Sequence, residues 1–206
     1  MIEKPWYKKW WGVLLIIFGV LTLINIVSHQ PQEKNQVSTT SAPETQQTPK
    51  KTDVEILAEV EKRLGEYQKR LKGYYPDDDM LKKLSEDVVK LVILETGYAK
   101  PENETQKKIL LKTKSLRPKV EILRREVYAK TIERAMLDKG FNTEVHARGA
   151  NKQILEYKFA LMSKALVYQL VNEGRILESA KNVDFKKLIF TDGFNSSWTY
   201  DLTKPN

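Results

Sequence analysis

One stretch of the sequence, WWGVLLIIFGVLTLINIV from Trp10 to Val27, restricts the possible folds more than any other part of the chain. It contains no charged side chain, and its apolar residues fall on every side of a helix. A bilayer core of about 30 Å requires roughly 20 such residues at about 1.5 Å each. The stretch therefore predicts one transmembrane helix, because a helix buried in a protein core would carry polar residues on one face.

Basic and aromatic residues immediately before this span predict its orientation. The residues expected to anchor it at the cytoplasmic membrane interface are Trp6, Tyr7, Lys8, Lys9, Trp10 and Trp11. The twenty residues after Ser28 contain only Lys34 as a cation. This bias places the amino terminus in the cytoplasm and the carboxyl-terminal head outside. A cleaved signal peptide has a shorter apolar region of about 7–15 residues and a small-x-small site, so we expect an uncleaved anchor.

Composition and periodicity divide the chain into four parts. Residues 1–28 form the cytoplasmic stub and anchor, and residues 29–52, rich in Gln, Thr, Ser and Pro, are expected to be a disordered linker. Residues 53–140 are expected to form a helical region, and residues 141–206 a small α+β domain. The aromatic and basic start, the single span and the polar tether together resemble small bacterial envelope proteins, a likeness that covers about the first fifty residues.

The helical region carries apolar residues at spacings of three and four. The first stripe starts after a cap at Thr52 or Asp53 and ends near Gly73. A second helix is expected to follow Asp77, Asp78 and Asp79 and to end at Gly97. It has so many apolar residues, Val89 and Ile93 included, that we expect it to be the most buried helix of the region. Its VVKLVIL core is also compatible with a strand. A third region starts near Asn103, is expected to end or kink at Pro118, and continues to Gly140. Short connections predict a three-helix bundle or long helical hairpins.

The period changes to two after Phe141. Alternation around Val145 and Ala147, a turn at residues 149–151, and alternation from Leu155 to Phe159 indicate a hairpin. Ser163 can cap a helix that pauses at Gly174. A second hairpin follows, with a loop at Asp192-Gly193. The order ββαββ predicts a small antiparallel sheet with a helix across one face, in an α+β chain.

The residues that could carry chemistry are few. The absence of cysteine excludes disulfides, zinc-thiolate sites and Cys nucleophiles. His146 is the one histidine after residue 52, and Glu144 could pair with it weakly from the same strand face. The sequence has no phosphate-binding glycine motif, nucleophile elbow or recognised metal-ligand spacing. We therefore expect no catalytic, cofactor or metal site, and interpret Asp77 to Asp79 as helix capping.

Two features suggest binding. The chain has a net charge of +8, and residues 107–139 hold eleven Lys or Arg and four acids. This basic helix could contact anionic lipid or polymer or simply be solvated, and nucleic acid is not expected outside the cell. Phe194, Trp198 and Tyr200 form the densest aromatic group beyond the anchor. Trp198 and Tyr200 share one strand face, which is either core or, if open, a candidate partner-binding surface.

These features favour a single-pass, extracytoplasmic, non-enzymatic protein whose head binds or scaffolds another envelope component. One alternative is an envelope hydrolase, which would need a deep cleft with two close, buried carboxylates. Another is a homo-oligomeric structural protein built through the stripe at residues 54–71, which requires Leu57, Leu64 and Leu71 to be exposed in the monomer. The expected partners are membrane lipid and either another protein or a second copy of the chain.

Overall fold

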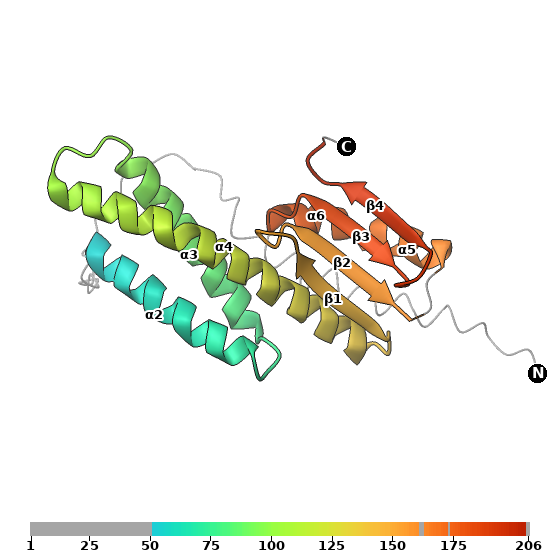
Figure 1. Ribbon diagram of the computed structural model, residues 1–206. Helices are drawn as coiled ribbons and strands as arrows, with labels where there is room; N and C mark the ends of the chain where they lie inside the picture. The colour runs from blue at the N-terminus through green and yellow to red at the C-terminus, as the bar shows by residue number, and fades with distance from the viewer. Residues whose placement is uncertain (1–50, 161–162, 173, 205–206) are drawn as a thin grey trace, which may run out of the picture.

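The computed structural model describes residues 51–160, 163–172 and 174–204. The expected span, its interface residues and nearly all of the linker lie outside the described residues. Within the described ranges, no helix combines the length and the apolar character that crossing a bilayer requires. The fold of this part is α+β, with five helices and one mixed sheet of four strands (Figure 1).

Three helices pack lengthwise at the amino-terminal end of the head: α2 (Asp53–Leu71), α3 (Asp78–Gly97) and α4 (Glu104–Asp138) (Figure 1). Their starts follow the capping signals of the sequence. Thr52 forms a capping box with Glu55, and the side chains of Asp77 and Asn103 accept hydrogen bonds from the third residue of their helices. The segment containing VVKLVIL is therefore helical, and α2 ends at Leu71, two residues before Gly73.

Pro118 was expected to end or kink the helix. Helix α4 continues through it, so the first of these two outcomes is wrong. Proline removes one backbone donor and leaves the carbonyl of Lys114 without its helical partner. Both residues are exposed, so water can reach that carbonyl. The helix ends instead at Asp138, and Gly140, two residues later, has a φ of +80° that suits glycine. The amides of Gly140 and Phe141 donate hydrogen bonds to the carbonyls of Leu137 and Met136.

The three helices enclose one hydrophobic core, to which α2 contributes Leu57 and Leu64. These side chains are 4% and 6% exposed, so the stripe of α2 is not available to a second copy as the homo-oligomer hypothesis required. Helix α3 is less buried than its composition predicts. Val89 and Ile93 are 57% and 63% exposed, because α2 and α4 cover only part of its circumference. The excess of apolar residues, from which we expected α3 to be the most buried helix, therefore lies partly on its exposed side.

We expect Asp77→Ala to lower the free energy of unfolding by about 1 kcal/mol at neutral pH, because it removes the cap of α3. The carboxylate of Asp77 accepts hydrogen bonds from Arg70, at 2.6 Å, and from the amide of Met80, at 3.0 Å. The Arg70 guanidinium, followed by the Met80 amide, holds the pKa of Asp77 below its ordinary 3.8. The folded state therefore binds this proton less readily than the unfolded state does.

The stabilisation from Asp77 is consequently complete above the unfolded-state pKa and is lost as the pH falls through the lower folded-state pKa. Urea unfolding of both proteins at several pH values measures this. The difference between wild type and variant should shrink in acid. An equal difference at neutral and strongly acidic pH would contradict the role of the ionised carboxylate.

The sheet contains β1 (Thr143–Arg148), β2 (Ile154–Phe159), β3 (Lys187–Thr191) and β4 (Ser197–Asp201), in that spatial order. The two expected hairpins are confirmed, but the expectation of an antiparallel sheet is wrong, because β2 and β3 pair in parallel. Helices α5 (Lys164–Asn172) and α6 (Ile176–Asn182) connect them. A crossover over one face returns the chain to the end where β2 began, so β3 must run in the same direction.

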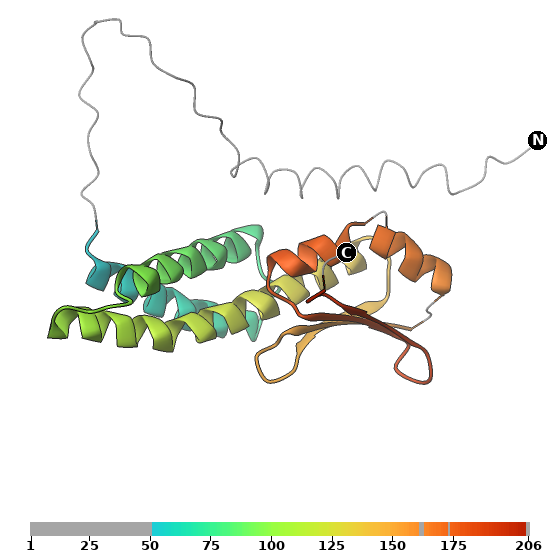
Figure 2. The ribbon, with the colours of Figure 1, turned by 90° about the horizontal axis from the view of Figure 1, so that it is seen from above.

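A second hydrophobic core fills the space between the sheet and its helices. Figure 2 shows α5 and α6 on one face of the sheet and no described element on the other, which we call the open face. Tyr128, Ala129 and Met136 of α4 belong to this core, whereas Val127 and earlier residues of α4 belong to the core of the helical region. One continuous helix therefore supports both cores. The predicted domain limit at 140/141 stays a prediction.

Candidate functional site

The predicted aromatic surface lies on β4 and the loop before it. Phe194 is 93% exposed in the β3–β4 loop. Trp198 and Tyr200 are half-buried on the helix-covered face and pack against the core, and the Tyr200 ring meets Phe190 edge-on at 6.0 Å between centroids. The shared face of Trp198 and Tyr200 is thus partly core and partly accessible. Phe194 lies beyond it, at the tip of the hairpin.

The position of β4 in the sheet adds a feature that the sequence does not show. It is a terminal strand, so one side of its backbone has no described strand beside it. The amide of Leu202 donates to the carbonyl of Lys186, and the amide of Asp192 donates to the carbonyl of Ser196. These two hydrogen bonds establish which residues of β4 direct their backbone groups toward β3, because such residues alternate along an antiparallel strand. In this alternation the amide and carbonyl of Thr199 point away from β3, as do those of the residues two positions before and after it. We call this row of backbone groups, with Phe194, Trp198 and Tyr200, the β4 edge.

The opposite edge of the sheet is partly occupied. Glu133 of α4 is 5% exposed. Its carboxylate accepts a hydrogen bond from the amide of Val145 in β1 at 3.3 Å and another from the ammonium group of Lys130 at 2.5 Å. A helix beside an edge strand protects its backbone from pairing with another chain. Of the two edges of the described sheet, β4 is therefore the one open to a further strand.

His146 and Glu144 lie side by side on the open face of β1, as their spacing predicts. The Nε2 atom of His146 is 3.3 Å from Glu144, and Lys158 of β2 lies 3.4 Å from the same oxygen. Hydrogen bonds from His146 and then Lys158 hold the pKa of Glu144 below its usual value. Glu144 is thereby kept ionised and paired, which suits a surface ion-pair network better than proton transfer.

A cleft of about 570 Å³ lies where the helical region meets β1. It is lined by the end of α2, the middle of α4 and β1, and includes Lys72, Glu126, Lys130, His146 and Lys152. Lys152 pairs with Glu126 at 3.1 Å across it. Lys130 and Lys152 are each paired with a carboxylate, Glu133 and Glu126, so Lys72 is the one lysine of this lining to which the described residues give no ion pair. The sequence gives no signal for the cleft, because its residues come from three separate segments.

Two carboxylates are buried in the described residues, and they lie in separate cores. Asp87 in the helical region is held by Arg63 and Lys90, and Glu133 near the sheet is held by Val145 and Lys130. Neither lines the cleft. Within the described ranges, no three His, Asp or Glu side chains are grouped as metal ligands would be. The close carboxylate pair that the hydrolase hypothesis needs does not occur among these buried groups.

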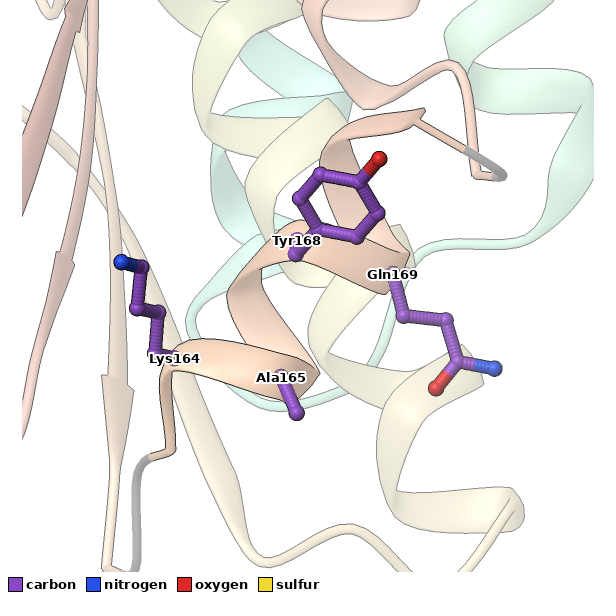
Figure 3. Close-up of a pocket in the computed structure, with 4 residues that line it drawn as sticks. All are labelled: Lys164, Ala165, Tyr168 and Gln169. Carbon is purple, nitrogen blue, oxygen red and sulfur yellow. The ribbon is translucent and has the colours of Figure 1, made fainter.

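A depression of about 490 Å³ lies on the outer side of α5 (Figure 3). Lys164, Ala165, Tyr168 and Gln169 line it, all from that one helix. Figure 3 shows Lys164 and Gln169 pointing in opposite directions, so the polar atoms do not converge on one point. The exposed Tyr168 ring makes this a surface feature of the helix and gives it no evident chemistry.

The basic stretch at residues 107–139 divides into two structural parts. In the second part, Arg124 and Arg125 are 6% and 2% exposed and bond to Asp184 and to the carbonyl of Asn151. These arginines join α4 to the β1–β2 turn and to the loop between α6 and β3, and they are not available to a ligand. In the first part, the lysines are exposed.

Comparison of the chain with family models, curated proteins and solved structures found no match.

Proposed function

We propose that this chain is a single-pass membrane protein of the cell envelope whose extracytoplasmic head is a non-enzymatic binding module. The apolar stretch from Trp10 to Val27 supports the anchor, and the Lys and aromatic residues before it support the orientation. The observation that carries the binding role is the β4 edge. It combines backbone groups that have no partner among the described residues with exposed Phe194 and accessible parts of Trp198 and Tyr200.

The expected ligand of the β4 edge is an extended segment of another envelope protein. An added strand would bond to the outward amide and carbonyl of Thr199 and gain affinity from the main chain. Its side chains would meet Trp198 and Tyr200 on one face, where aromatic groups supply most of the energy of an interface. Helices α2 and α3 lie at the opposite end of the described part from β4, so they leave this edge accessible (Figure 1).

Thr199→Pro is expected to abolish partner binding while leaving the fold intact. Proline removes the outward amide and is tolerated on the solvent side of an edge strand. The measurement is photo-crosslinking in the native membrane from a reactive residue at Phe194, followed by identification of the adduct. We expect a discrete adduct with another envelope protein that disappears with Thr199→Pro and is absent when the reactive residue replaces the exposed Tyr74.

An adduct that survives Thr199→Pro would contradict strand addition, provided circular dichroism shows the variant folded. The location is tested separately. Because the chain has no cysteine, Asn195→Cys creates a single thiol in the head. A membrane-impermeant maleimide added to intact cells should label it. Labelling only after lysis would place the head in the cytoplasm and overturn the proposal.

A further inference from the structure

The exposed side of the first half of α4 is a basic surface with an apolar residue at its centre. We call it the α4 outer face, and its residues are Lys107, Lys108, Leu111, Lys112, Lys114 and Lys119, all exposed. Spacings of three and four place them on one side of the helix. Between Glu104 and Ile122 the chain has six Lys or Arg and two Glu. Leu111 is 68% exposed among these lysines.

Half of this charge has no counter-ion among the described residues. Lys107 pairs with Glu104, and Lys112 pairs with Glu61 of α2, each at 2.6 Å. Among the described residues, no carboxylate lies within ion-pair distance of Lys108, Lys114 or Lys119. The remaining cation of this half of α4, Arg117, forms ion pairs with Glu95 and Glu121. Unpaired lysines around an exposed leucine are the pattern of a surface that meets anionic lipid.

The α4 outer face also lies at the end of the head where the preceding chain enters. Helices α2 and α4 run in the same direction, with Glu61 beside Lys112, so the first turns of both lie at one end (Figure 1). The segment that leads to the anchor joins the head at Thr52, directly before α2. A flexible chain as long as the 25 residues from Ser28 to Thr52 would have a root-mean-square reach of roughly 25–30 Å. With the anchor of the proposed function in place, the membrane would therefore lie within reach of these lysines.

We propose that the α4 outer face rests on the anionic headgroups of the membrane that anchors the chain. Lys108, Lys114 and Lys119 contact lipid phosphates, and Leu111 inserts among the headgroups. This contact would lay the helical region along the bilayer, with the β4 edge at the far end of the head. The inference depends on the anchor and orientation of the proposed function, and it adds a second, lipid-dependent contact to them.

The test measures the distance from the α4 outer face to the bilayer in the full chain. Ser115→Cys places a single fluorescent donor between Leu111 and Lys119, and nanodiscs carry an acceptor lipid in phosphatidylcholine with or without phosphatidylglycerol. We expect energy transfer to rise with phosphatidylglycerol and to fall again in high salt, which screens exposed charges. A donor at Asn195→Cys, at the other end of the head, should change little.

Charge removal provides the matched comparison. The triple variant Lys108→Gln, Lys114→Gln and Lys119→Gln should lower the ratio of bound to free head by about 100-fold, so the lipid-dependent transfer is lost. The control Lys69→Gln, Lys82→Gln and Lys164→Gln removes the same charge from exposed lysines elsewhere and should retain it. Circular dichroism establishes that both variants are folded.

The outcomes separate this inference from the proposed function. A chain that enters nanodiscs but shows equal transfer in both lipids, or equal loss in both triple variants, overturns the lipid contact and leaves the anchor intact. A signal that responds to soluble polyphosphate and not to phosphatidylglycerol also overturns it, in favour of an anionic polymer. A chain that does not enter nanodiscs overturns the anchor and this inference together.

Discussion

Phe190→Ala is expected to lower the free energy of unfolding by about 3–5 kcal/mol, because it opens a cavity at the centre of the sheet. Phe190 is 0% exposed in β3. Its ring stacks on Tyr157 at 5.2 Å and on Phe159 at 6.4 Å between centroids, and Tyr200 meets its edge. The alanine side chain would remove all three ring contacts, and the neighbouring rings cannot fill the space without leaving their own positions.

Urea unfolding of the full chain in detergent, followed by far-ultraviolet circular dichroism, measures this loss. Phe194→Ala is the matched control, since it removes the same side chain from an exposed loop. We expect it to change the free energy of unfolding by less than about 0.5 kcal/mol. Comparable losses from the two substitutions would show that the sheet core is not built around Phe190.

Asp87→Ala is expected to destabilise the helical region by about 3 kcal/mol, because it leaves Arg63, whose side chain is only 15% exposed, without its main partner. Asp87 is 1% exposed on α3, and its two oxygens lie 2.5 and 2.7 Å from Arg63 of α2. Glu59 remains beside Arg63 at 2.6 Å and offsets part of the loss. The remaining guanidinium charge would still face a protein interior that solvates it poorly.

The double variant Arg63→Met with Asp87→Leu should recover most of the stability, because apolar side chains of similar size can replace a buried ion pair. Asp79→Ala is the matched control for Asp87→Ala. Its carboxylate pairs with Lys83 at 3.0 Å in an exposed position, where ion pairs contribute less than about 1 kcal/mol. Thermal unfolding measures the stability of the three variants relative to the wild type. A double variant no more stable than Asp87→Ala would show that the charges themselves are required.

Local signals predicted the elements well, because they act within one turn of helix or one strand. Thr52, Asp77 and Asn103 cap helices as their residue types and positions predict. The alternation of Trp198 and Tyr200 placed both on one face of a strand, which the structure bears out. The spacing of Glu144 and His146 likewise predicted their pairing.

Predictions failed where the outcome depends on which elements become neighbours. Pro118 does not end α4, because its exposed position lets water satisfy the carbonyl that proline leaves free. Val89 and Ile93 are exposed because two neighbouring helices cannot surround α3. The cleft at β1 and the burial of Arg124 and Arg125 depend on segments that meet only after folding.

The sequence by itself therefore determined the order of helices and strands, the two hairpins and the expectation of an apolar anchor, because each follows from periodicity, caps and composition over short distances. Only the tertiary structure decided that β2 and β3 are parallel, that β4 is a terminal strand of the described sheet, and that α4 supports two cores. Strand order and burial depend on contacts between distant segments, and no local pattern records them. The basic residues of α4 illustrate this. The sequence shows them as one basic stretch, and only the contacts with distant segments leave the lysines of the α4 outer face exposed and bury the later Arg124 and Arg125.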